Sequence, residues 1–194
     1  MRWELFPVVQ LPVQINRKFK FPLSERKVAA AEIIPISVSQ SAAYLNDEDT
    51  YAADHAIDKD LASSAAALTQ DGGSWLRLQL DKTYTVFSVT IYYRFYEDWF
   101  FNTWCAKNET QFKQCVDRDN NIQVSVYQGV HVRASCGTVQ LTYALQQFDQ
   151  IYTLSCGVAG DAVVLSKSSD RLTVFEVVVA GTGTIISLSN YRIS

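Results

Sequence analysis

The chain has 194 residues, of which 48% are hydrophobic and 19% are charged, and its formal net charge is −3. This is enough apolar material for the core of one domain, while an acidic balance without a marked cluster of lysine and arginine argues against nucleic acids and anionic membranes as partners. No run of roughly 18 apolar residues is present, so the sequence predicts no transmembrane segment.

Residues 1–32 are expected to form an N-terminal extension. Pro7, Pro12 and Pro22 interrupt its apolar runs, and residues 24–31 would form at most one or two helical turns. Pro7 and Pro12 also break the apolar run that a signal peptide would need. Either a signal has been removed, or the secretion inferred below is wrong.

From Ile33 onward the hydrophobic residues recur with a period of two, which is typical of β-strands. The expected inward-facing residues are Leu76, Leu78 and Leu80 in the strand 75–80, Phe87, Val89, Ile91 and Tyr93 in the strand 87–94, and Ile122, Val124 and Val126 in a third strand.

Further short strands are expected in five other segments, with turn-rich stretches between them. Many short strands without a helical period predict an all-β sandwich or barrel, which would occupy residues 33–194 as one domain. These additional strands are expected at 33–38, 150–154, 162–166, 172–179 and 184–189.

The four cysteines fall into two local pairs. Nine residues separate Cys105 from Cys115, and nineteen separate Cys136 from Cys156. This pattern predicts two disulfides, each contributing about 3 kcal/mol to stability. A metal site would need Cys-x-x-Cys or a nearby histidine, and the sequence has neither. A glycosylation sequon begins at Asn108 inside the first cysteine loop, and with the disulfides it predicts an extracellular, secreted or cell-surface protein.

The segment 55–63 has the composition of a cation-binding loop. It reads His-Ala-Ile-Asp-Lys-Asp-Leu-Ala-Ser, without strand or helix period, and it offers carboxylates at Asp58 and Asp60 and a hydroxyl at Ser63. Calcium prefers six to eight such oxygen ligands on a curved loop. A solvated acidic surface loop would have the same composition, so both interpretations stay open.

Glu176 is the second informative position. It lies in the segment 172–179, which is otherwise apolar on both faces and therefore expected to be buried. A buried carboxylate is costly unless it is paired or bound to a metal ion. The alternative is a glutamate at a strand end that faces water.

Several motifs, in order over roughly residues 33–181, resemble the discoidin-type (galactose-binding-like) domains and closest of all the F-type lectins. The loop starting at His55 resembles their x-A-V-D-G-N/D motif, and the segment starting at Leu172 resembles L-x-L-C-E-V-E-V-x-G. Trp75-Leu-Arg-Leu-Gln-Leu is similar to W-W/L-x-V-D-L, and Val89-Thr-Ile-Tyr-Tyr-Arg is similar to V-x-I-x-x-R. The pair Cys136 and Cys156 resembles the F-type lectin cysteine pair. The resemblance implies a jelly-roll β-sandwich.

It also implies a structural Ca²⁺ ion. Lys59 stands where the family usually has glycine, a residue that tolerates positive φ better than lysine does. Phe175 replaces the cysteine that the family has before its glutamate. The implied ligands are the carbonyls of His55, Asp60 and Phe175, the carboxylates of Asp58 and Glu176, and the Ser63 oxygen.

The family's fucose-binding pattern is only partly present. Arg94 matches its first arginine, whereas Tyr96 replaces the aspartate and the expected histidine would fall near Thr69 and Gln70. An aromatic-rich segment, 95–104, which includes Trp99, follows instead. Such rings stack on sugars, but they would equally form a satellite core, or a patch for a protein or lipid partner. The implied ligand-binding residues are Thr69, Gln70, Arg94, Tyr96 and Trp99.

No catalytic constellation accompanies these features. There is no histidine near a plausible nucleophile, no phosphate-binding loop and no redox cysteine motif. We therefore expect a non-catalytic, calcium-stabilised carbohydrate-binding module whose partner is a glycan or glycoprotein. The alternative is a structural or assembly module that uses the same fold for self-association or to bind a protein partner, without sugar.

Overall fold

The structure is a computed structural model, and almost all of its described residues are in strands and short turns. Among them, no helix is long and apolar enough to cross a membrane. The described residues are 30–60, 63, 65–67, 73–93, 108, 110–111, 120–140, 151–168 and 171–183.

The described strands form two antiparallel sheets. Six strands follow the order β1-β9-β4-β7-β5-β6, with β2 paired to β4, and β3 pairs separately with β8. Two short 3-10 helices lie between β2 and β3. The elements are β1 (Ala31–Ile33), β2 (Ser37–Gln40), η1 (Tyr44–Asn46), η2 (Ala53–Ala56), β3 (Ala65–Ala67), β4 (Ser74–Tyr92), β5 (Gln123–Gln128), β6 (His131–Thr138), β7 (Ile151–Lys167), β8 (Leu172–Val174) and β9 (Glu176–Gly183).

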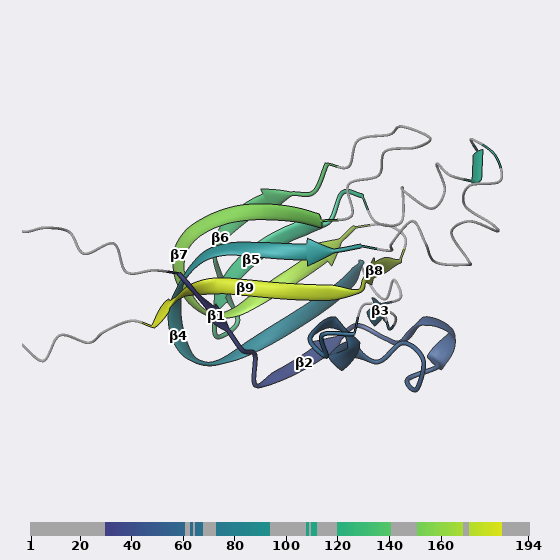
Figure 1. The fold of residues 1–194 in the computed structure, drawn as a ribbon, viewed down its shortest axis with the longest axis horizontal. Helices are drawn as coiled ribbons and strands as arrows, with labels where there is room; N and C mark the ends of the chain where they lie inside the picture. Colours follow the sequence, from purple (N-terminus) through teal and green to yellow (C-terminus); the bar gives the residue numbers. More distant parts are fainter. Residues whose placement is uncertain are drawn as a thin grey trace, which may run out of the picture.

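Two long strands, β4 and β7, make this sheet into a sandwich. The first part of β4 pairs with β2 and with the end of β7, whereas its second part pairs with β9 and with the start of β7. The register shifts between Gln79 and Tyr84, where β4 bends over to the second layer (Figure 1). The predicted all-β sandwich is therefore confirmed.

The strand boundaries differ from the predicted ones in several places, and the expected strand 172–179 is divided into β8 and β9 at Phe175. The expected strand 184–189 lies outside the described residues. Residues 75–80 and 87–94 were expected as separate strands, but β4 is continuous, because it bends through a register shift instead of a turn. The segments 150–154 and 162–166 are likewise parts of one strand, β7. The expected strand 33–38 is divided into β1 and β2 around Pro35, which has no N–H to donate to a sheet. β1 begins at Ala31, two residues before the expected domain start.

The core lies between the two layers. The alternation predicted for residues 75–80 is confirmed, since Leu76, Leu78 and Leu80 are all buried. Phe87, predicted to face inward, is 37% exposed, and Val86 is buried in its place. A bulge between Val86 and Ser88 breaks the alternation, so that Val86 and Val89 both face inward and Phe87 does not; no local sequence signal reveals it. The other predicted core residues that are buried are Val89, Ile91, Tyr93, Ile122, Val124 and Val126.

One predicted disulfide lies within the described residues. Cys136 of β6 is bonded to Cys156 of β7, with their Cα atoms 4.5 Å apart. The bond joins the last strand of the sheet to the first part of β7. Cys105 and Cys115 lie outside the described residues, so the pairing of these two stays a prediction.

Candidate functional site

The loop after η2 gathers oxygen atoms around Ser63. Its hydroxyl donates to Asp58 Oδ2 at 2.7 Å and lies 2.9 Å from the carbonyl oxygen of Asp60. The backbone N–H of Asp60 donates to Asp58 Oδ1 at 2.8 Å. A hydroxyl has one proton, so it satisfies only one of its two oxygen neighbours well. Side-chain and backbone oxygens are thus held together on one tight turn.

Lys59 is at the tip of this turn and has a left-handed backbone, with φ of 64°. This conformation suits glycine and is strained for a lysine. It directs the backbone N–H of Lys59 to Glu176 Oε2, 2.9 Å away on β9. The loop therefore keeps the conformation that the family's glycine implies, even though the residue is lysine.

Glu176 is the predicted buried carboxylate, and only 6% of its surface is exposed. Burial raises the pKa of its carboxyl above the usual value, and the nearby charge of Asp58 raises it further. The hydrogen bond from the Lys59 N–H acts in the opposite direction. The surroundings of Glu176 thus favour its neutral form more than water does.

Backbone pairing places Glu176 beside the loop. Phe175 lies between β8 and β9, and its N–H donates to the carbonyl oxygen of Tyr92 at the end of β4, at 2.9 Å. β8 pairs with β3, which follows the loop directly, and this two-stranded sheet brings the loop to the start of β9. The elements that contain the predicted ligands therefore meet at one end of the sandwich.

These residues fit a hard cation such as calcium. Within the part of the chain that the structure describes, no three His, Cys, Asp or Glu side chains form a metal-binding group on their own. A calcium ion would therefore depend on backbone carbonyls and the Ser63 hydroxyl as well as on the two carboxylates. The implied set has this mixed composition: the carboxylates of Asp58 and Glu176, the carbonyls of His55, Asp60 and Phe175, and the Ser63 oxygen.

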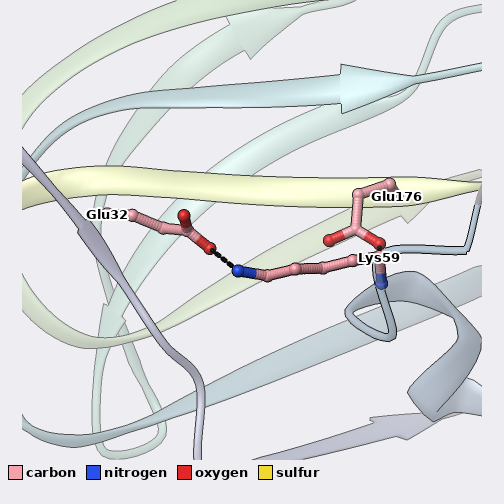
Figure 2. Close-up of polar contacts among 3 residues, drawn as sticks. All are labelled: Glu32, Lys59 and Glu176. Atoms are coloured by element: carbon pink, nitrogen blue, oxygen red, sulfur yellow. Dashed lines mark hydrogen bonds and ion pairs between the residues drawn. The ribbon is translucent and has the colours of Figure 1, made fainter.

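The structure adds two features that the sequence did not reveal. The ammonium group of Lys59 forms an ion pair with Glu32 Oε1 of β1, at 3.2 Å, as Figure 2 shows. The Nδ1 atom of His55 is buried and has no hydrogen-bond partner among the described residues. No local pattern could have found the ion pair, because 26 residues of chain separate its two members and the pairing of β1 with β9 brings them together.

The predicted ligand-binding residues, Thr69, Gln70, Arg94, Tyr96 and Trp99, lie outside the described residues. Their flanking strand is described, and both ends of β4 lie at the same end of the sandwich as β3 and β8 (Figure 1). Asn108, the predicted glycosylation site, is exposed, and its Nδ2 donates to Gln111 Oε1 at 2.8 Å.

Comparison with known proteins identifies the fold. No protein-family model matches the chain. No curated protein matches it either. Among solved structures, a fucose-binding module of Streptococcus pneumoniae is similar with a TM-score of 0.54 and 20% identity, over 77% of this chain and 94% of that one.

Two further structures have the same architecture. The lectin-binding domain of lectinolysin, a His 62 mutant complexed with Lewis b, has a TM-score of 0.52 and 16% identity, over 76% of this chain and 92% of that one. Truncated AlyQ, with CBM32 and alginate lyase domains, has a TM-score of 0.51 and 14% identity, over 81% of this chain and 34% of that one. The resemblance to discoidin-type lectin domains thus holds at the level of the fold, and the chain has the β-sandwich fold of fucose-binding and related carbohydrate-binding modules.

Proposed function

We propose that the chain is a non-catalytic carbohydrate-binding module with a lectin-like role outside the cell. The observation that carries this proposal is the match over 77% of the chain and 94% of a fucose-binding module. The similarity spans the whole neighbouring domain, so it is more than a shared hairpin or half-sandwich.

The glycan would bind at the end of the sandwich where β4 begins and ends. The segments before and after β4 contain the expected contact residues, Thr69 and Gln70 before it and Arg94 and Trp99 after it. The loop after η2 lies at the same end. Arginine donates hydrogen bonds to sugar hydroxyls, and aromatic rings stack on the apolar faces of sugars. A rigid sandwich that presents several loops at one end is well suited to this kind of recognition.

A structural Ca²⁺ ion is the second part of the proposal. It would be held by the carboxylates of Asp58 and Glu176 with the neighbouring oxygens, and its charge would favour the ionised form of the buried Glu176. The ion would also link the loop that contains Asp58 to Glu176 of β9. Its role would be to fix the loops next to the glycan, with no part in any reaction.

A protein-binding or assembly module is the alternative. Tyr96 replaces the family's aspartate, and no histidine is near Gln70, so the fucose-contact pattern is incomplete. Apolar side chains are also exposed on the described surface, among them Ile34 and Ile36 on either side of Pro35. These observations favour a partner other than fucose itself.

A glycan array distinguishes the two functions. The calcium-loaded protein should bind a restricted set of glycans, and free fucose or galactose should compete for this binding. Trp99→Ala serves as the site variant, and Phe87→Ala, a partly exposed aromatic residue of β4 away from both of its ends, serves as the aromatic control. Uniform absence of binding across fucose, galactose and their derivatives would favour the assembly module, which sedimentation of the protein would then test.

A further inference from the structure

Lys59 contacts carboxylates on two strands outside its own loop. Its backbone N–H contacts Glu176, and its ammonium group contacts Glu32 on a different strand. Asp58 and Asp60 flank it in the sequence. Figure 2 shows the lysine side chain running along β9 between the two glutamates. One residue thus links the loop, β9 and β1.

Two glutamates from different strands contact Lys59. Glu176 Oε2 lies 2.9 Å from its backbone nitrogen, and Glu32 Oε1 lies 3.2 Å from its ammonium nitrogen. The Lys59–Glu32 pair alone contributes little, because the two side chains are 66% and 43% exposed. The ammonium group also adds one positive charge to a loop in which both sequence neighbours of Lys59, Asp58 and Asp60, are acidic.

A lysine at this position strains the backbone. Its φ of 64° strains any residue with a side chain, and a glycine would remove that strain. The N–H bond to Glu176 needs no side chain, so the ion pair of the ammonium group with Glu32 is the contact that a glycine would lose.

We propose that Lys59 is a built-in cation of the metal loop, which stabilises the loop in the absence of calcium and weakens the binding of calcium to it. The proposal rests on the calcium site proposed above, and it assigns Lys59 a positioning role. An ammonium group close to the site favours the carboxylates when no ion is present and repels a divalent ion when one arrives. If Lys59 mattered only for the shape of the loop, replacing it would lower both the stability without calcium and the affinity for calcium.

Lys59→Met tests this, because it keeps the unbranched side chain and the strained φ and removes only the charge. In chelator at low salt, this variant should melt roughly 2–4 °C below the wild-type protein. Titration calorimetry should show that it binds calcium roughly 3- to 10-fold more tightly, the order of effect expected from one unit charge at a wet surface. Both differences should decrease in about 1 M salt, where charges are screened over about 3 Å.

Two further variants separate charge from conformation. Lys59→Arg keeps the charge and should behave like the wild-type protein in both measurements. Lys59→Gly removes the charge and the strain together, so it should bind calcium more tightly without the full loss of stability in chelator.

The result that would overturn the proposal is a Lys59→Met protein that melts like the wild type in chelator, or that binds calcium more weakly. If neither protein binds calcium, the calcium assignment fails, and the role of Lys59 as an internal cation is decided by the salt-dependent melts in chelator alone. Glycan binding does not enter these measurements, so the proposed lectin function is tested independently.

Discussion

Replacing Glu176 by glutamine should have different effects on stability with and without calcium. Glutamine has the same shape, and its carbonyl oxygen still accepts the 2.9 Å hydrogen bond from the Lys59 N–H. It carries no charge that burial at 6% exposure would penalise. In chelator, Glu176→Gln should therefore be as stable as the wild-type protein or slightly more stable.

In calcium the order should reverse. An ion that binds only the folded state stabilises it by about 2.7 kcal/mol when its concentration is 100 times the dissociation constant, and the variant would lose most of this gain. For a chain of this size, that corresponds to a decrease in Tm of roughly 5–10 °C. Glu48→Gln, which removes an exposed carboxylate outside the predicted ligand set, should keep the full calcium response.

The pH dependence provides a second measurement on the same proteins. Burial raises the pKa of Glu176 in the folded state above its usual value of 4.5, so in chelator its contribution to stability is fully present below about pH 4.5 and is lost as the pH rises through the folded pKa. This loss should be absent from Glu176→Gln. Thermal melts over pH 4–8, with chelator or calcium, measure both effects. A variant that is equally destabilised in calcium and in chelator would refute the calcium assignment.

Three other predictions concern the disulfide, the bulge and the aromatic segment. Replacing Cys136 and Cys156 together by serine should cost about 3 kcal/mol in denaturant melts, because the bond spans a separation of 20 residues; an unchanged midpoint would contradict this. Ile91→Ala should cost about 2–5 kcal/mol and Phe87→Ala less than half as much, since only Ile91 is fully buried; equal losses would argue against the bulge. Trp99→Ala should abolish glycan binding at a cost below about 1 kcal/mol, and a loss of about 3–5 kcal/mol would instead place the ring in the core.

The sequence predicted the residues that follow a regular period and missed the places where the backbone changes register. The alternation of Leu76, Leu78 and Leu80 needed only the period of a strand. The bulge at Val86 turns Phe87 outward although Val89 and Ile91 face inward as predicted, and the bend of β4 near Tyr84 needs neither glycine nor proline. Such irregularities depend on the pairing partners, so a single sequence does not reveal them.

The sequence predicted those parts of the candidate site where a charged side chain stands in an apolar segment or where acidic residues cluster in a loop. Glu176 was conspicuous as a carboxylate within an apolar strand, and the loop from Asp58 was conspicuous by composition. The ion pair between Lys59 and Glu32 could not be predicted, because it depends on the register between β1 and β9. The contact between Lys59 and Glu32 arises only in the tertiary structure.

The central claim, that glycans bind at the end of the sandwich formed by these loops, is tested most directly by NMR titration of the isotopically labelled protein. The ligand would be the monosaccharide that competes best on the array, added in the presence of calcium. If glycans bind there, saturable chemical-shift changes should concentrate at the end of the molecule that contains Lys59 and Tyr93. Shifts confined to the turn at Gly129 and Val130, which lies at the other end of β5 near Asp161, would contradict it, as would the absence of any saturable shift.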